Sequence, residues 1–352
     1  MKITIAERLH PFSHKPGMSC VLPKSYWKVE VFPSLLRFQS LLNPNKKIEY
    51  VLGIVGPILD FTAEVDLEKG QIRVFGKTQT GYLRYIITKK TDGIALFFEK
   101  VPEKMSKEAI LLATSPESDS VVQLTERLSL GAHTSQDMDL IKRRKDLREI
   151  FPLWLRLSQL LPQHSEPIEP IGTFRLLLSC QESINRAEKL TILPAFTQLF
   201  QTALTGILSP RLIDEEYQGI LAIGEIIPNS MTPLPILIEG GRLIRSLFFQ
   251  ESGRHLQFLP CLPPDFTSGR FTGIQTQNQE QISFEWSKHQ IKKVIIQTQE
   301  ASCVTLQFPK MIRSFRLRTS LRESGVKKKN QDGQFELELH SNKTLLLDRF
   351  EK

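Results

Sequence analysis

The chain has 352 residues with a formal net charge of +8, and 40% of its residues are hydrophobic. A chain of this length exceeds the usual size of one hydrophobic core, so two or three domains are expected. The hydrophobic fraction is ordinary for a soluble globular protein and excludes an intrinsically disordered chain. No uncharged run approaches the roughly 20 residues of a membrane-spanning helix, and no signal peptide is visible. We therefore expect a cytoplasmic protein.

Residues 1–130 are predicted to form a β-rich domain. Residues 27–31, Trp-Lys-Val-Glu-Val, alternate apolar and charged side chains, as a half-buried strand does. The Asp92-Gly93 pair lies between two apolar runs and is a strong hairpin signal. Turns at this spacing predict an antiparallel sandwich or barrel.

Residues 131–253 are predicted to be helical, with a proline-rich linker near residues 162–171. Thr134 and Asp137 have the spacing of a capping box at the start of a helix. An apolar stripe with helical spacing follows, and Pro152 within it should kink or split the helix near Glu149. The stripe consists of Ile150, Leu153, Trp154, Leu157, Leu160 and Leu161.

Two further helices are expected in this middle region. One should begin near Pro194, because proline suits the first turn of a helix. The other should cover residues 240–252 and end at Gly253 as its C-cap. The mixed charges around residues 142–148 are typical of a solvated helix face.

Residues 254–352 return to the period of a β-strand and predict a C-terminal antiparallel β-sandwich. Ile282, Phe284 and Trp286 lie on one face of a strand, with Ser283 and Glu285 on the other. Trp286 is therefore expected to be buried in the sandwich.

Two stretches of this region carry a family resemblance. Residues 259–274 read Leu-Pro-Cys-Leu-Pro-Pro-Asp-Phe-Thr-Ser-Gly-Arg-Phe-Thr-Gly-Ile, and residues 284–286 read Phe-Glu-Trp. Over residues 233–308 the chain resembles the C-terminal region of family 95 glycoside hydrolases, the inverting α-fucosidases. It departs from the family at residues 277–279, which replace an arginine–glycine–glycine run, and at residues 288–289, which replace an aspartate–glycine hairpin.

Catalysis by inversion needs two carboxyl groups about 6.5–9.5 Å apart. In the resembled family these groups come from a barrel of twelve helices, whereas residues 133–252 have room for only about four or five. The resemblance therefore implies no catalytic residue in this chain. From the residues alone, the acidic cluster Asp214, Glu215 and Glu216 is the catalytic candidate, and a solvated loop is the alternative interpretation.

A basic patch lies between Lys310 and Lys329, where eight residues are basic and one is acidic. The sequence predicts a strand that carries two arginines, followed by a basic loop. Such a patch could bind nucleic acid or acidic lipid, and a solvated loop is the alternative. The candidate anion-binding residues are Arg316, Arg318, Lys327, Lys328 and Lys329.

Metal, disulfide and cofactor sites are not predicted. His10 and His14 have the spacing of two ligands on one helix, but Pro11 and Pro16 argue against a helix there. No Walker A loop or Gly-x-Gly-x-x-Gly turn is present. Four cysteines are scattered without paired spacing, which fits a reducing compartment: Cys20, Cys180, Cys261 and Cys303.

The sequence as a whole predicts an α+β protein with a β-rich N-terminal domain, a short helical middle segment and a C-terminal β-sandwich. We interpret it as a glycan-related protein without a complete hydrolase centre, which binds a carbohydrate or serves as a scaffold. An anion-binding protein that uses the basic patch is one alternative. A minimal glycosidase that uses residues 214–216 is the other.

Overall fold

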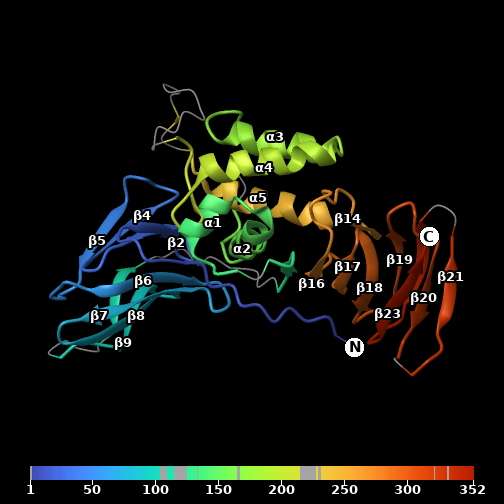
Figure 1. Cartoon of the computed structure of the whole chain (residues 1–352), viewed down its shortest axis with the longest axis horizontal. Helices are drawn as coiled ribbons and strands as arrows, with labels where there is room; N and C mark the ends of the chain where they lie inside the picture. Colours follow the sequence, from blue (N-terminus) through green and yellow to red (C-terminus); the bar gives the residue numbers. More distant parts are fainter. Residues whose placement is uncertain are drawn as a thin grey trace.

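The chain adopts an α+β fold in which two β-rich regions flank a short layer of helices (Figure 1). This computed structural model confirms the fold class that the sequence predicts. The helices α3, α4 and α5 lie along one side of the molecule, between the N-terminal and C-terminal sheets. The structure describes residues 2–103, 109–114, 125–132, 134–164, 167–214, 227–228, 231–320, 322–330 and 333–352.

The N-terminal β region contains two antiparallel sheets in the described part of the chain. The first contains, in spatial order, β1 (Phe12–Ser13), β6 (Leu59–Asp66), β7 (Gln71–Thr78), β8 (Gly81–Lys90), β9 (Gly93–Lys100) and β10 (Ile110–Thr114). The second contains β2 (Met18–Val21), β3 (Trp27–Val31), β4 (Leu35–Ser40) and β5 (Lys47–Val51). The predicted hairpin is confirmed, because Lys90 pairs with Gly93 across the two-residue turn of Thr91 and Asp92.

The helical layer contains five helices among the described residues: α1 (Met138–Arg144), α2 (Leu147–Gln159), α3 (Phe174–Asn185), α4 (Lys189–Ala203) and α5 (Leu234–Phe248). A short hairpin of β12 (Leu204–Thr205) and β13 (Ser209–Pro210) follows α4. The stripe predicted from residues 150–161 is buried on α2 and just beyond its end. Helix α3 was not predicted, although Phe174, Leu177 and Ile184 supply its buried face.

The predicted boundaries of the first two helices are wrong in detail. Asp137, not Thr134, caps α1 by accepting hydrogen bonds from the amides of residues 139 and 140. Pro152 does not split the helix, since α2 continues through it. The break falls earlier, at Lys145 in the left-handed conformation, because Asp146 can then cap α2.

The other two helix predictions are also shifted. Helix α4 begins at Lys189, five residues before Pro194, so this proline lies inside the helix. Helix α5 begins at Leu234 and ends at Phe248, because residues 249–252 pair as a strand. Gly253 forms the turn of that hairpin rather than a helix cap, with φ of 58°.

The C-terminal region is a β-sandwich, as predicted. Its larger sheet contains, in spatial order, β11 (Arg127–Ser129), β16 (Gly269–Gln275), β17 (Gln281–Ser287), β18 (Gln290–Gln297), β23 (Thr344–Glu351), β20 (Ser314–Arg318) and β21 (Val326–Lys329). Its smaller sheet contains β14 (Phe249–Ser252), β15 (His255–Phe258), β19 (Ser302–Gln307) and β22 (Gln334–Leu339). The pairing of β15 with β19 is parallel, which departs from the purely antiparallel prediction.

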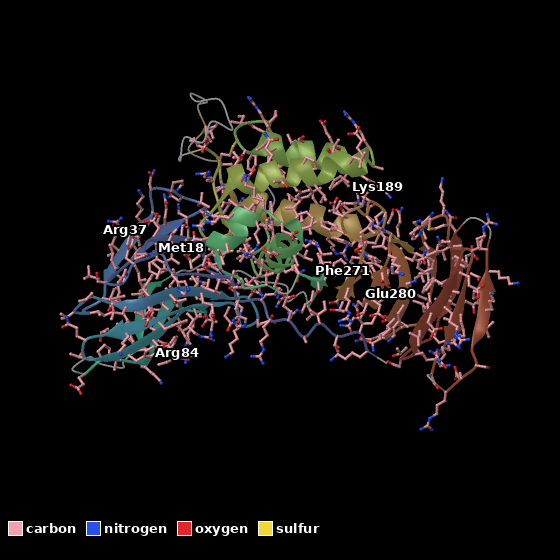
Figure 2. All side chains as sticks on the ribbon, in the orientation of Figure 1. Met18, Arg37, Arg84, Lys189, Phe271 and Glu280 are labelled. Carbon is pink, nitrogen blue, oxygen red and sulfur yellow. The ribbon has the colours of Figure 1, made fainter. Side chains whose placement is uncertain are left out.

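Aromatic rings pack the two sheets of the sandwich against each other. Phe258 of the smaller sheet lies 5.3 Å from Phe284 of the larger one, measured between ring centroids. Phe315 and Phe335 make a second contact across the sandwich, at 4.7 Å. Phe271, labelled in Figure 2, lies where the larger sheet meets α5 and contacts Phe248 of that helix. The sandwich and the helices therefore share one apolar interface.

Hydrophobic side chains from all three regions form one continuous core. Strand β11 also crosses the predicted boundary, since Leu128 pairs with Phe271 of the C-terminal sheet. The division into residues 1–130, 131–253 and 254–352 stays a prediction.

The first residues of the chain run from the C-terminal sheet to the N-terminal sheet (Figure 1). Ile3 packs on Ile295 and Leu346 on the outer face of the larger sheet. Further along, the carbonyl of Leu9 accepts a hydrogen bond from the amide of Leu67 in the N-terminal region, at 3.0 Å. This N-terminal segment therefore ties the two β regions together.

Trp286 is buried at 2% exposure, and its Nε1–H donates a 3.0 Å hydrogen bond to the carbonyl of Phe266. Replacing Trp286 with alanine should lower the free energy of unfolding by about 3–5 kcal/mol, as large core truncations do. Trp286→Phe keeps a ring but loses the hydrogen bond, so a smaller loss of about 1–2 kcal/mol is expected. Denaturant unfolding measures both, and an unchanged midpoint for Trp286→Ala would contradict the buried role.

Candidate functional site

Helices α2 and α5 pack very closely, and two glycines of α5 make this approach feasible. A Cβ on Gly240 would lie 2.4 Å from the indole ring of Trp154, and one on Gly241 would lie 2.0 Å from the hydroxyl of Ser158. Trp154 also donates a 3.1 Å hydrogen bond to the carbonyl of Leu237. Any larger side chain at either glycine would push the helices apart, so this packing fixes the position of α5 on α2.

A cavity of about 100 Å³ lies beside this contact, and both apolar and polar side chains line it. Its walls are α2, the residues that follow α2, α5, and Glu126 just before β11. It therefore lies where segments far apart in the sequence converge. The polar side chains that line it are Glu126, Ser158, Gln159, Gln163, Arg242 and Arg245.

Glu126 and Arg245 form the charged pair of this cavity. The Nε of Arg245 lies 3.0 Å and 3.1 Å from the two carboxylate oxygens of Glu126, which is 1% exposed. The same guanidinium lies 3.4 Å from a carboxylate oxygen of Glu251. Burial raises the pKa of Glu126, and the opposing attraction of Arg245 offsets only part of this effect. The site thus holds a carboxyl group that favours its proton more than an exposed glutamate does.

Gln159 supplies an unsatisfied donor. Its Oε1 accepts a 3.2 Å hydrogen bond from Arg156, which fixes the orientation of the amide. Its Nε2 is buried and finds no hydrogen-bond partner among the described residues. A buried amide N–H without a partner is costly, so this nitrogen is expected to meet a water or a ligand oxygen.

The described residues that line the cavity include hydrogen-bonding groups but no aromatic side chain. Carboxyl, amide and guanidinium groups line it together, and these groups can bind the hydroxyls of a sugar from several directions. All three tryptophans of the chain, Trp27, Trp154 and Trp286, are at most 4% exposed. None of them can therefore stack on a ligand from the surface.

Sequence reasoning missed this site. Glu126 and Arg245 are 119 residues apart, and neither belongs to a recognisable motif. The paired glycines at 240 and 241 within an apolar helix are the one local signal, because glycine there indicates close helix packing.

The predicted acidic cluster is only partly described. Asp214 is buried, and its carboxylate lies 3.6 Å from the guanidinium of Arg211. Arg211 is itself buried and donates a 2.7 Å hydrogen bond to the carbonyl of Thr202. The interpretation of Asp214 as part of a solvated loop is therefore wrong. Glu215 and Glu216 lie outside the described residues, so catalysis by this cluster stays a prediction.

The basic patch is largely paired with acid. Arg316 lies 2.8 Å from Asp348 of β23, and Arg318 contacts the same carboxylate. Burial alone would raise the pKa of Asp348, but the two arginines hold it below its usual value. Lys327 pairs with Glu351. Three of the five predicted anion-binding residues thus already contact carboxylates.

The three lysines do not lie in a loop, as the sequence predicted, but on β21 at the edge of the larger sheet. Leu317 pairs with Val326, and the pairing continues to residue 329. All four residues of β21 are exposed. Lysines on an edge strand discourage pairing with other chains, which gives them a structural role. Polyanion binding by Lys328 and Lys329 stays a prediction.

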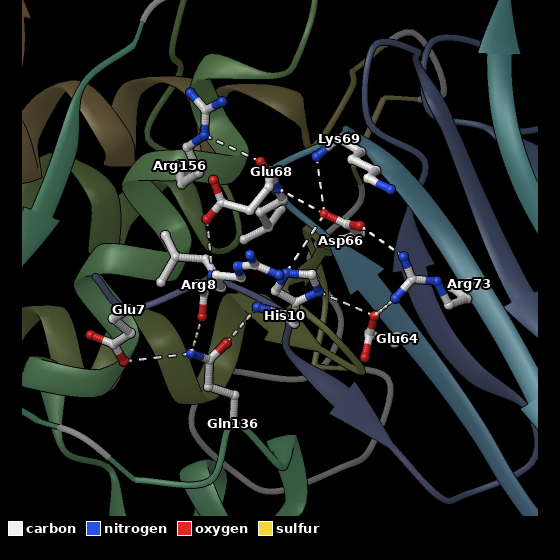
Figure 3. Close-up of polar contacts among 12 residues, drawn as sticks. Glu7, Arg8, His10, Glu64, Asp66, Glu68, Lys69, Arg73, Gln136 and Arg156 are labelled. Atoms are coloured by element: carbon white, nitrogen blue, oxygen red, sulfur yellow. Dashed lines mark hydrogen bonds and ion pairs between the residues drawn. The ribbon is translucent and has the colours of Figure 1, made fainter. Parts of the chain in front are cut away.

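His10 and His14 bind neighbouring strand residues instead of a common ligand. The Nδ1 of His10 lies 3.2 Å from Glu64, and Arg73 bridges Glu64 and Asp66 (Figure 3). His14 lies 3.0 Å from the hydroxyl of Thr62. In the part of the chain that the structure describes, no group of three His, Cys, Asp or Glu side chains could hold a metal ion. We interpret the His10 network as an anchor of the N-terminal segment.

Residues 250–347 match the family model described as glycoside hydrolase family 95, C-terminal domain. The match begins in β14 and ends in β23, so it covers nearly all of the sandwich. It confirms the resemblance read from residues 259–286. No curated protein shows significant similarity to the chain. Among the described helices, none is both long and apolar enough to cross a membrane.

Glu126→Gln should reveal the raised pKa of Glu126. Folding favours the protonated carboxyl, so its stabilising contribution is complete below the ordinary pKa of 4.5 and is lost as the pH rises through the raised value. The free energy of unfolding of the wild type, minus that of Glu126→Gln, should therefore fall with increasing pH across this window. Urea unfolding at a series of pH values measures it. A difference that rises with pH would show that Arg245 outweighs burial.

Proposed function

We propose that this protein is a carbohydrate-binding relative of the glycoside hydrolases and that the cavity between α2 and α5 is its binding site. The observation that carries the proposal is the buried Nε2 of Gln159, a donor without a partner among the described residues, on a side chain that lines the cavity with Glu126 and Arg245. The match of residues 250–347 to a glycoside hydrolase family domain supports a carbohydrate as the ligand.

The charges of the cavity suit a neutral sugar. Arg245 is balanced by Glu126 and Glu251, and Arg242 contacts Glu239. An anionic ligand would compete with these carboxylates, whereas sugar hydroxyls can donate to carboxylates and accept from amides and guanidinium groups. The four free cysteines support a reducing, cytoplasmic location.

The helical layer supports a role in binding rather than in hydrolysis. The described residues form five helices, far fewer than a twelve-helix barrel needs. Glu126 of the cavity and Glu251 beside it both contact the one guanidinium of Arg245. That arrangement holds them as partners of a cation rather than as an acid and a base on opposite faces of a sugar.

We expect no hydrolysis of aryl-fucosides or other simple glycosides by the purified protein. The reason is the absence, in the described residues, of a barrel that could position a general acid and a general base across a sugar. Release of the aryl group, followed by absorbance, measures the activity. Turnover that disappears in Asp214→Asn or Glu216→Gln would contradict this expectation and would favour a minimal glycosidase.

Binding of neutral sugars tests the proposal directly. Fucose and methyl fucoside should bind to the wild type, and Gln159→Leu should weaken binding by about tenfold, because the variant removes the free donor but keeps an apolar stem of similar size. Isothermal titration measures the affinity.

Gln299→Leu is the matched control, since Gln299 is exposed on the bend between β18 and β19. It should bind as the wild type does. Equal affinities of Gln159→Leu and the wild type would remove the cavity as the binding site. No binding of any tested neutral sugar to the wild type would favour the scaffold role.

A further inference from the structure

Strand β5 forms an open edge of the second N-terminal sheet. The strand order β2-β3-β4-β5 places it last, and it pairs with no other described strand than β4. It lies on the side of the molecule that is away from the C-terminal sandwich (Figure 1). No residue of this strand lines the α2–α5 cavity, so the edge is separate from the proposed carbohydrate site.

Alternate residues of β5 direct their backbone groups away from the sheet. The amide of Leu52, just after β5, donates a 2.8 Å hydrogen bond to the carbonyl of Ser34, just before β4. Backbone groups alternate in direction along an antiparallel ladder, so the even-numbered residues of β5 face β4. The amides and carbonyls of Lys47, Glu49 and Val51 therefore point outward, and all three residues are exposed. Such an edge can pair with a further strand.

Charges of alternating sign cross the sheet and end at this edge. Glu30 of β3 lies opposite Arg37 of β4, and Arg37 lies opposite Glu49 of β5. Arg37, labelled in Figure 2, forms a 2.8 Å ion pair with Glu49. This row therefore ends on a carboxylate, and the next cation in the alternation has to come from outside the sheet. Two residues earlier, the exposed Lys47 ends its own row with a positive charge.

We propose that β5 pairs with β5 of a second copy of this chain, antiparallel about a two-fold axis at Ile48. In this register Lys47 of each copy lies opposite Glu49 of the other, so both charge rows continue across the interface. An axis at Lys47 would place that lysine opposite its own copy, and an axis at Glu49 would do the same with two carboxylates. Like charges directly opposite destabilise a strand pair. On the other face Ile48, which is only partly buried against the core, would meet its copy.

The edge strand β21 shows the opposite pattern. It carries Lys327, Lys328 and Lys329 in succession, so any register that overlaps the lysines of two copies places like charges together. Strand β5 instead has one charge of each sign two positions apart, which is the spacing that a two-fold axis requires. Because the paired segment is short, we expect a concentration-dependent dimer rather than a permanent one.

Sedimentation equilibrium over a series of protein concentrations tests the pairing. The wild type should show a reversible equilibrium between monomer and dimer. Lys47→Glu and Glu49→Lys should each raise the dissociation constant of the dimer at least about tenfold, because each places two like-charged pairs across the interface. An equimolar mixture of the two variants should dimerise as the wild type does, since their altered charges are complementary in the proposed register. Circular dichroism checks that both variants are folded.

Lys77→Glu and Glu338→Lys are the matched controls, because they reverse the same charges at exposed positions on strands of other sheets. Each should dimerise as the wild type does. A monomeric wild type at every concentration, or unchanged dimers of Lys47→Glu and Glu49→Lys, would overturn the proposal. So would a mixture of these two variants that stays monomeric. Neutral-sugar binding should be unchanged in both, so the dimer and the carbohydrate site can fail independently.

Discussion

Phe248, the last residue of α5, packs its ring on Phe266, Phe271 and Trp286 at the inner face of the C-terminal sandwich. The other end of the same ring group reaches α2 and α4, because Phe266 contacts Phe151, which in turn contacts Phe196. Aromatic contacts of this kind bury large areas and prefer defined geometries, so they fix both position and orientation. This ring group therefore helps to set the angle of α5 on the sheet.

The position of α5 has consequences for charge as well as for packing. Arg245 lies one turn before Phe248, and the packing of that turn places its guanidinium on Glu126 and Glu251. The position of Glu126 is set by β11, which begins one residue later and pairs with β16. The carboxyl group is therefore buried by tertiary structure alone, and the same packing that buries it also brings the cation that compensates it. Two glycines keep α5 close to α2. The α2–α5 cavity lies beside this close contact, and Gln159 and Glu126 line it with polar groups.

Charge pairing across strands shapes the rest of the surface. In the larger sheet, Glu285 lies opposite Lys293, and Lys293 lies opposite Asp348, so charges of alternating sign cross neighbouring strands. Opposite charges that face each other across strands stabilise the sheet only modestly. The N-terminal segment follows the same principle, since His10 and Arg73 share the carboxylates of Glu64 and Asp66. Around these strands, charges of opposite sign are therefore matched locally.

The sequence by itself determined the features that depend on near neighbours. Alternation in residues 27–31 and 282–286 predicted strands with buried faces, and the structure confirms both. The apolar stripe of α2 and the resemblance at residues 259–286 were equally visible, because each depends on residues a few positions apart.

Tertiary structure decided everything that joins distant segments. The helix boundaries are an exception, because the cap at Asp146 and the hairpin of residues 249–258 are local contacts that the apolar pattern did not reveal. The pairing of Lys327 with Glu351 could not be read from a run of lysines, since β21 meets β23 only through β20. The α2–α5 cavity is the clearest case. Its carboxyl group and its cation are 119 residues apart, and a sequence pattern carries no information on a contact that exists only after the helices pack.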